Sequence, residues 1–405
     1  MKKFNKVLSV VVASAMVMAM AGCGNTDNGS AATGTNAATE SAAADNGAAS
    51  GSVFKIGGIG PTTGGAAVYG LAVQHGAEIA AEEINAAGGI NGYQVEFKFQ
   101  DDEADAEKSV NAYNALKDWG AQIIDGSTTS GACIAVTDKT KEDNMFQITP
   151  SGSAVECVQY DNNFRVCFSN PNQGLASAQY IGENGLAEKI AVIYDSSDVY
   201  SSGIYEKFVK EAENQPFEVV AAEAFTADNK TDFSVQLQKA KDAGADMVFL
   251  PIYYQESALI LTQAAAMGYA PKWFSCDGMD GILGGVDNFD VSLTEGVMLL
   301  TPFAADATDD LTQSFVTKYK EKYGETPNQF AADSYDAIYV IKAAIEKSGV
   351  TPDMSVSDIC DGMKAAMTEI TVDGLTGNGM TWTADGEANK APKAVVIENG
   401  AYKAM

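Results

Sequence analysis

Strand and helix patterns alternate from Val53 almost to the end of this chain, and this alternation constrains its fold more than any other feature of the sequence. Short apolar runs such as Met247–Leu250 are typical of buried strands, and stretches such as Ala106–Trp119 have helical spacing. Strands that alternate with helices predict parallel sheets covered by helices. One set runs over 53–149, and a second set in similar order runs over 172–275. We therefore expect an α/β fold with two Rossmann-like lobes, each built on a parallel central sheet.

The last third of the chain has a different pattern. A strand is expected over 297–300, and three helices follow at 311–323, 331–347 and Val356–Met367 with no strand pattern between them. We expect these helices to cover the first lobe. Glycines then punctuate the segment around 380–383, and 394–397 is expected to end the chain as an antiparallel strand.

Composition excludes several classes of function. The net charge of −28 at pH 7 repels nucleic acid, so no nucleic-acid partner is expected. Arg165 and His75 are the only arginine and histidine, which argues against histidine-based triads and zinc sites. We predict no catalytic residue, no metal and no cofactor. An exported enzyme that uses the carboxylates of Asp277 and Asp280 for glycoside chemistry is the rival hypothesis.

The N-terminus resembles a bacterial lipoprotein signal. Three lysines precede an apolar run over 7–20, and the small residues Ala21 and Gly22 lead to Cys23. The run is too short to span a bilayer comfortably. The resemblance implies a signal peptide over 1–22, a lipid on Cys23 and an extracytoplasmic protein anchored to the cell membrane; a plain secretory signal is the alternative. Residues 23–52 are small and polar, without aromatic or large aliphatic side chains, and we interpret them as a flexible linker.

The other cysteines do not form a CxxC pair. Cys157 and Cys167 flank a turn-like segment over 159–163, and an exported location permits a disulfide between them. Buried free thiols are the alternative that the sequence leaves open.

The loops that follow the expected strands carry the candidate binding residues, because open α/β sheets bind ligands at the carboxyl ends of their strands. In the first lobe these loops are rich in hydroxyls, which suit a carboxylate at a helix N-terminus. In the second lobe they are aromatic and acidic, which suits an ammonium group. The alternative interpretation is that these residues are helix caps without a ligand and solvent-exposed acids. Together the two lobes would complement a zwitterion with an apolar side chain.

Several stretches in this order resemble the type I periplasmic-binding-protein family, in its leucine/isoleucine/valine-binding branch. They are 60–70, 84–92, 164–167 with 173–174, 319–323, 335–337 and 373–377. The resemblance implies a lobe over 53–167 plus 302–376, a second lobe over 168–301 plus 377–405, and a three-stranded hinge that crosses near 166–169, 300–302 and 375–380.

The resemblance also implies roles for particular residues. The carboxylate-binding loop falls on Thr128, Thr129 and Ser130, and the next loop on Ser151 and Ser153. The ammonium-binding acid falls on Asp277, where branched-chain binders often have glutamate. The aromatic contacts fall on Tyr69, Tyr200 and Tyr254. The shorter acid leaves room for one methylene, and the loop from Ser151 also departs from the usual pattern, so the side-chain preference is open.

The resemblance therefore implies a monomeric receptor that binds an apolar amino acid by hinge closure and delivers it to an ABC permease with its ATPase subunits. The same fold acting as a sensor for a signalling partner, or binding a small amide or peptide, is the alternative that the sequence does not separate from import.

Overall fold

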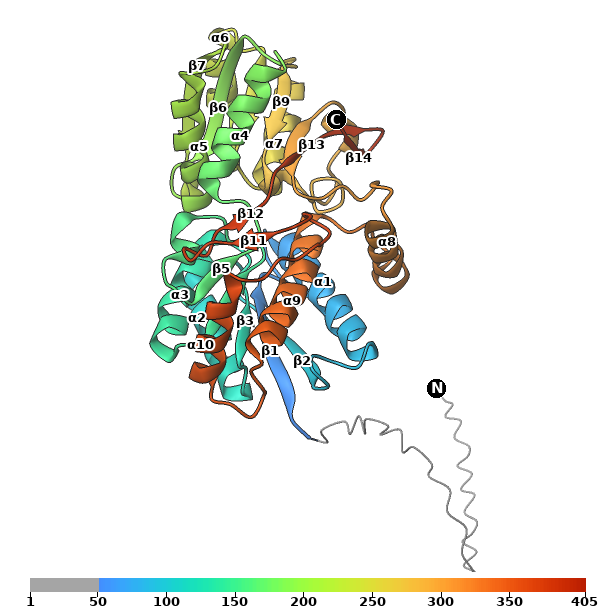
Figure 1. The fold of residues 1–405 in the computed structure, drawn as a ribbon. Coiled ribbons are helices and arrows are strands. Elements are labelled where there is room, and N and C mark those ends of the chain that lie inside the picture. The colour runs from blue at the N-terminus through green and yellow to red at the C-terminus, as the bar shows by residue number, and fades with distance from the viewer. Residues whose placement is uncertain (1–50) are drawn as a thin grey trace, which may run out of the picture. The chain divides into compact units, whose positions relative to one another are not determined.

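The structure, a computed structural model, describes residues 51–405 (Figure 1). The predicted signal peptide, the predicted lipidation site at Cys23 and nearly all of the predicted linker lie outside the described residues. Over the described part the element order alternates strand and helix, as the sequence predicts, and the strands form two separate parallel-centred sheets.

The first sheet has five parallel strands in the order β2-β1-β3-β4-β5. The strands are β1 (Val53–Gly60), β2 (Gln94–Asp101), β3 (Ile123–Asp125), β4 (Phe146–Thr149) and β5 (Asn163–Arg165). The connecting helices are α1 (Ala67–Ala86), α2 (Ala106–Trp119) and α3 (Ser130–Asp143). β3 and β4 are fully buried, as expected of a parallel sheet that is covered on both faces.

The second sheet has seven strands in the order β14-β13-β10-β9-β8-β6-β7. The strands are β6 (Lys189–Asp195), β7 (Glu218–Phe225), β8 (Met247–Leu250), β9 (Lys272–Ser275), β10 (Met298–Thr301), β13 (Lys393–Glu398) and β14 (Ala401–Ala404). Its helices are α4 (Asn170–Glu183), α5 (Val199–Ala212), α6 (Ser234–Asp242) and α7 (Tyr254–Ala266). The two C-terminal strands pair antiparallel, which confirms that prediction for the segment around 394–397.

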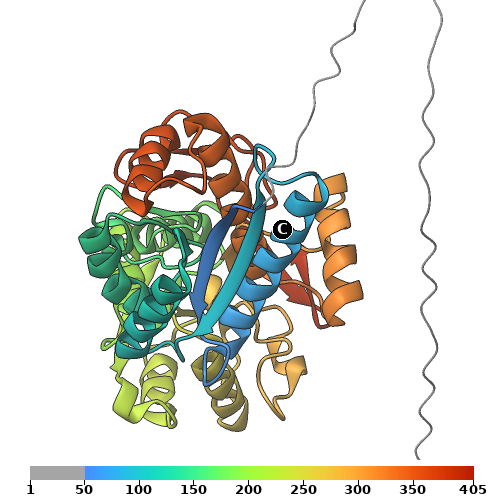
Figure 2. The ribbon, with the colours of Figure 1, turned by 90° about the horizontal axis from the view of Figure 1, so that it is seen from below.

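The three C-terminal helices are α8 (Asp310–Tyr323), α9 (Gln329–Ser348) and α10 (Val356–Met367), and they return to the first lobe as predicted. α8 and α9 pack on α1, and α10 packs on α9 and β4. Figure 2 shows these orange and red helices around the blue strands of the first sheet.

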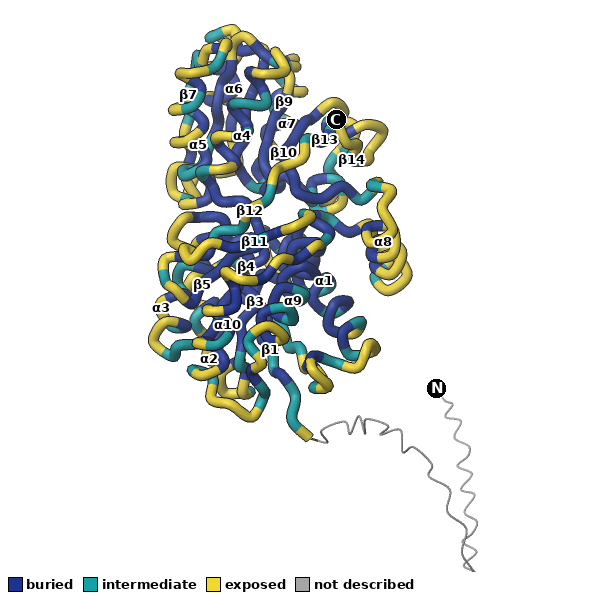
Figure 3. The backbone as a smooth tube through the Cα atoms, viewed as in Figure 1, coloured by how far each residue is buried: buried dark blue, intermediate teal, exposed yellow. Residues whose placement is uncertain are grey.

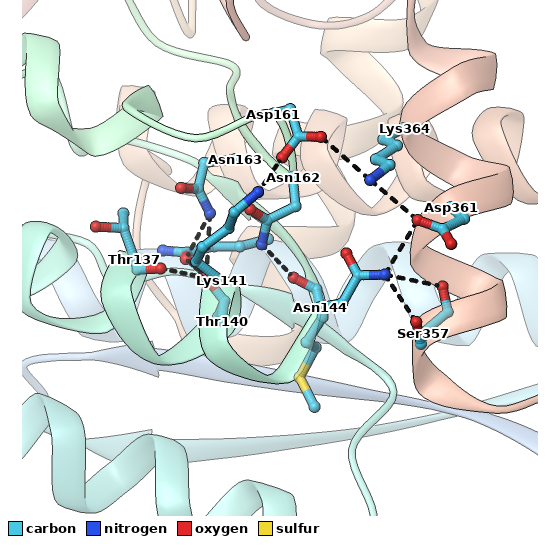
Figure 4. A network of polar contacts seen from close by, with 12 residues as sticks. Thr137, Thr140, Lys141, Asn144, Asp161, Asn162, Asn163, Ser357, Asp361 and Lys364 are labelled. Carbon is cyan, nitrogen blue, oxygen red and sulfur yellow. Dashed lines mark hydrogen bonds and ion pairs between the residues drawn. The ribbon is translucent and has the colours of Figure 1, made fainter.

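Polar contacts fix α10 to the end of α3 (Figure 4). Asn144, which ends α3, donates from Nδ2 to Ser357 Oγ at 2.8 Å and to Asp361 Oδ1 at 3.0 Å. Lys364 pairs with Asp161 at 3.2 Å. Because these contacts join segments more than 200 residues apart in sequence, they attach the C-terminal helices to the N-terminal lobe.

The chain passes between the lobes three times. The first crossing joins β5 to α4, the second joins β10 to α8, and the third runs from α10 to β13 through the short antiparallel pair β11 (Thr381–Trp382) and β12 (Ala388–Asn389). Trp382 Nε1 donates to the carbonyl of Arg165 at 2.8 Å, and the Arg165 N–H donates to the Gly386 carbonyl at 3.0 Å. This hairpin, which the predicted boundary at residue 377 assigns to the second lobe, is therefore hydrogen-bonded to the end of the first sheet.

The third crossing also carries a buried ion pair. Lys390 Nζ lies 2.8 Å from Asp333 Oδ1 on α9, and both side chains are almost fully buried. Lys390 also donates to Thr376 Oγ1 at 2.7 Å. The pair joins the segment just after β12 to α9 of the first lobe, and losing either charge would leave the other buried and unpaired.

The core lies along the two sheets, where the strands are mostly buried, and exposed residues gather on the outer turns of the helices (Figure 3). The five cysteines among the described residues are all buried and free, so the structure contains no Cys157–Cys167 disulfide. Short 3-10 segments complete the fold at η1 (Val155–Val158), η2 (Ala227–Asn229), η3 (Asp277–Met279) and η4 (Val291–Thr294). None of the helices in residues 51–405 combines the length and the apolar character that a bilayer span requires.

Candidate ligand-binding site

A narrow pocket lies between the carboxyl ends of the two sheets. Its lining consists of Tyr69, Thr128, Thr129, Ser130, Ser151, Tyr200, Tyr253, Asp277, Gly278 and Phe330. Seven of the nine residues predicted as ligand contacts are in this lining, and they come from both lobes. Ser153 and Tyr254 lie outside it, whereas Tyr253, Gly278 and Phe330 were not predicted.

The first lobe presents hydroxyl groups at the start of α3. Thr129 is the N-cap residue, but its side chain makes no capping hydrogen bond, and its buried Oγ1 has no partner. The first N–H groups of a helix have no intrahelical acceptor, and they form the positive end of the helix dipole. An unpaired hydroxyl beside this N-terminus therefore forms a site suited to a carboxylate.

The neighbouring loops hold this site in shape. Ser130 Oγ accepts hydrogen bonds from the N–H groups of Ser153 (3.2 Å) and Ala154 (3.1 Å). Ser151 Oγ donates to the Thr128 carbonyl at 2.6 Å, which ties the loop after β4 to the loop after β3. Only glycine fits at residue 60, at the end of β1, because a Cβ atom there would collide with the Thr128 side chain.

The Arg165 side chain supports the loop after β4 through hydrogen bonds. Its guanidinium is fully buried and donates to the carbonyls of Gly152 (3.2 Å), Ser153 (2.6 Å) and Ala154 (2.8 Å). The Ser153 hydroxyl is buried without a partner but does not face the pocket. In the structure Ser153 thus belongs to the support of the site through its main chain, and a direct ligand contact by its side chain remains a prediction.

The second lobe presents a buried carboxylate. Asp277 follows β9 and begins η3, and its side chain is only 5% exposed. The Tyr200 hydroxyl donates to Oδ1 at 2.6 Å and Gln173 Nε2 donates to Oδ2 at 3.0 Å. Both of these hydrogen-bond partners are neutral groups. Burial raises the pKa of Asp277 to about 7, although the hydrogen bonds oppose that shift. A positively charged group in the pocket would compensate the buried charge.

Aromatic rings form the walls of the pocket. Tyr69 from α1 packs on Phe330 from α9 with ring centroids 4.4 Å apart, and Tyr200 stacks on Tyr253 at 5.0 Å. Tyr254 packs against Tyr69 from outside the lining, and its N–H donates to the Tyr69 hydroxyl at 3.2 Å. The sequence shows two adjacent tyrosines after β8, but which ring lines the pocket depends on where α7 begins. Nothing in the sequence near Phe330 marks it as a site residue.

A wider cleft of about 820 Å³ adjoins the pocket and shares Thr129, Tyr200 and Tyr253 with it. Its acidic lining includes Asp195, and the carboxylate of Glu256 pairs there with Lys230 at 3.0 Å.

The groups that line the pocket are a carboxylate, hydroxyls and aromatic rings. Over residues 51–405, no group of three or more His, Cys, Asp or Glu side chains comes together to hold a metal ion. Asp280, the second acid of the rival glycosidase hypothesis, accepts a hydrogen bond from the Gln329 N–H at 2.9 Å.

Two lobes with parallel sheets, three crossings and a polar pocket between the strand ends define a type I periplasmic binding protein. The family model described as periplasmic binding protein matches residues 53–401, and the chain belongs to this family. Proteins of this family and fold are substrate-binding proteins, not enzymes.

Individual relatives agree with this assignment. A Leu/Ile/Val-binding protein homolog of Brucella melitensis is 30% identical over 300 residues, which cover 74% of this chain and 80% of the relative. A leucine-, isoleucine-, valine-, threonine- and alanine-binding protein of Pseudomonas aeruginosa is 30% identical over 303 residues, 73% of this chain and 79% of the relative. The branched-chain amino acid transporter substrate binding protein LivJ of Streptococcus pneumoniae, solved with isoleucine, is 28% identical and superposes with a TM-score of 0.78 over 87% of this chain and 99% of its own.

Proposed function

We propose that this protein binds a free amino acid with an apolar side chain between its two lobes and delivers it to an ABC importer. The observation that carries the proposal is that one side of the pocket favours a cation and the other side favours an anion. Asp277 in the second lobe is a buried carboxylate with neutral partners, and Thr129 in the first lobe is a buried hydroxyl without a partner, beside a helix N-terminus. An α-ammonium and an α-carboxylate satisfy both needs at once.

The relatives support the apolar side chain, since their names and the isoleucine-bound structure refer to branched-chain amino acids. The aromatic walls formed by Tyr69, Phe330 and Tyr253 provide apolar surface for such a side chain. The aspartate at position 277 is one methylene shorter than a glutamate, so the size of the side chain that this site prefers is decided by titration with ligands of different length.

The proposal also places the protein outside the cytoplasm. The lysines, apolar run and Cys23 of the N-terminus support cleavage after residue 22 and lipidation of Cys23. A lipid anchor followed by the polar stretch over 24–52 would let a monomeric binding domain reach a permease along the membrane. Loss of membrane association in a Cys23→Ala variant would support this part of the proposal.

The direct test is calorimetric titration of the protein with the common amino acids, short amides and dipeptides. We expect tight binding of leucine, isoleucine or valine. Their amides, which lack the carboxylate, should not bind. Binding only of ligands without an α-ammonium group would contradict the role given to Asp277.

Replacing Thr129 by alanine is expected to weaken ligand binding by about 1 to 2 kcal/mol, because one hydrogen bond to a charged carboxylate is lost. Calorimetry of the variant against wild type measures this loss. Thr317→Ala is the matched control, since Thr317 is an exposed threonine on α8, away from the pocket. Equal affinity of the Thr129→Ala variant and wild type would remove Thr129 from the site.

Ligand binding is expected to release protons near pH 6. The pKa of Asp277 is about 7 in the unliganded pocket, so the carboxyl is partly protonated there, and an adjacent ammonium group lowers that pKa. Affinity should therefore fall as the pH is lowered from 8 to 6. Burial raises the pKa of Tyr200, the titratable group in contact with Asp277, well above its usual value, so Tyr200 stays protonated. Titration in two buffers with different ionisation enthalpies measures the proton release, and identical heats at pH 6 would count against it.

A further inference from the structure

The short segment that carries Asp277 also contacts the first lobe directly. Three residues after Asp277, the Asp280 carboxylate of the second lobe accepts a hydrogen bond from the Gln329 N–H at 2.9 Å. Gln329 is the first residue of α9, which belongs to the first lobe. Asp280 is 4% exposed, so this interlobe contact is shielded from water.

Two more groups of the first lobe bind the same segment. Gln329 Nε2 donates to the Asp277 carbonyl at 3.1 Å, and the Tyr69 hydroxyl donates to the Gly278 carbonyl. The main chain of residues 277–278 and the side chain of Asp280 are thus attached to the first lobe, while the side chain of Asp277 faces the pocket. Ligand capture and lobe contact therefore occur on one short 3-10 segment.

The N-terminus of α9 also has a local cap, which uses a different N–H group from the one that Asp280 binds. Asn328 is the local N-cap of α9, and its Oδ1 accepts from the Ala331 N–H at 3.2 Å. The positive end of a helix attracts an anion nonetheless, and the attraction is larger in a partly buried setting. Because Asp280 and α9 belong to different lobes, this attraction stabilises the arrangement in which the lobes are together.

We propose that Asp280 is a positioning residue that latches the closed lobes through the N-terminus of α9 without touching the ligand. This inference rests on the proposed function, since hinge bending that opens the pocket would separate Asp280 from Gln329. The latch stabilises the closed state and has no counterpart in the open state, so it slows the release of bound ligand.

Two substitutions test the latch from its two sides. Asp280→Asn keeps the shape and removes the charge. Gln329→Pro removes the N–H group that donates to Asp280, and proline is well tolerated at the first position of a helix. Asn328 has extended backbone (ψ −178°), which is compatible with a following proline. Gln329→Ala, which removes only the side chain, isolates the contribution of the backbone N–H.

The measurements are the dissociation rate of L-isoleucine by stopped flow and the radius of gyration at saturating L-isoleucine by small-angle X-ray scattering. We expect Asp280→Asn and Gln329→Pro each to speed dissociation about tenfold, with the association rate little changed. The double variant should be no faster than the single ones, because both remove the same contact. Asp309→Asn is the control, since Asp309 caps α8 within the first lobe through Thr312.

The outcomes separate the latch from the proposed function. Wild-type dissociation rates in both variants, equal rates for Gln329→Pro and Gln329→Ala, or the same acceleration in the Asp309→Asn control would each overturn the latch. Failure of the wild type to bind any amino acid would overturn the proposed function instead. In that case scattering from the unliganded proteins decides the latch: Asp280→Asn should be more extended than wild type, and identical profiles would refute it.

Discussion

Replacing Asp277 by asparagine is expected to weaken amino-acid binding at least about 30-fold. The ammonium group of the ligand would lose its only proposed anionic partner in a site where both groups are shielded from water. Truncating one partner of a buried, hydrogen-bonded charge pair typically costs about 2 to 5 kcal/mol, which is a loss in affinity of roughly 30-fold to several thousandfold. Calorimetry with leucine, isoleucine and valine measures this loss.

The same variant is expected to be at least as stable as wild type without ligand. The pKa of Asp277 is raised from 3.8 to about 7 in the folded protein. Its contribution to stability is therefore fully present below pH 3.8 and is lost as the pH rises through 7, so at pH 8 the buried ionised carboxylate opposes folding. Asparagine removes that cost. A melting temperature at pH 8 equal to or above that of wild type, together with weakened binding, would assign the defect to the site and not to misfolding.

An exposed aspartate provides the control for this experiment. Asp290 accepts a hydrogen bond from the Ser292 N–H at 3.0 Å on the surface of the second lobe. Asp290→Asn should bind ligand as wild type does. Retained affinity in Asp277→Asn would contradict the assignment of the ammonium site, whatever the stability of the variant.

The regular elements could be predicted from the sequence wherever the local pattern was strong. The bounds predicted for Ala106–Trp119, Met247–Leu250 and Val356–Met367 agree with the structure. β5 was missed because its three residues include Asn163 and Arg165, and only pairing with β4 makes them a strand. The short strands β12 and β14 were missed for the same reason, since their pairing partners and not their composition define them.

The site could be predicted to the extent that it lies on loops at strand ends. Thr128, Thr129 and Asp277 follow parallel strands, and the geometry of such sheets brings these positions together. Phe330 could not be found in this way, because it lies at the start of α9. That helix reaches the pocket only through tertiary packing, which no local sequence pattern predicts. Tyr253, and not the predicted Tyr254, lines the pocket because α7 begins at Tyr254 and Tyr253 lies in the preceding loop.

Arg165 is expected to be the residue whose loss destabilises the fold most among the pocket's supports. Its side chain is fully buried, and its donors satisfy the carbonyls of three successive residues, Gly152 to Ala154. Methionine has a similar shape but no donors, so Arg165→Met leaves these buried carbonyls unpaired, at about 1 to 3 kcal/mol for each fully unsatisfied group before relaxation. We expect a loss of about 3 to 5 kcal/mol in the free energy of unfolding, measured by urea denaturation.

Two other variants show which of Arg165's contacts matter. Glu387 is partly exposed and lies 3.4 Å from Arg165 Nε, so Glu387→Gln should cost less than about 1 kcal/mol. Lys320→Met removes an exposed cation from α8 and should change stability by no more than about 0.5 kcal/mol. If Arg165→Met were as stable as Lys320→Met, the carbonyl contacts would not be what holds the loop. If Glu387→Gln were as damaging as Arg165→Met, the ion pair with the third crossing would be the main contribution, and the support of the binding loop would come from the hinge.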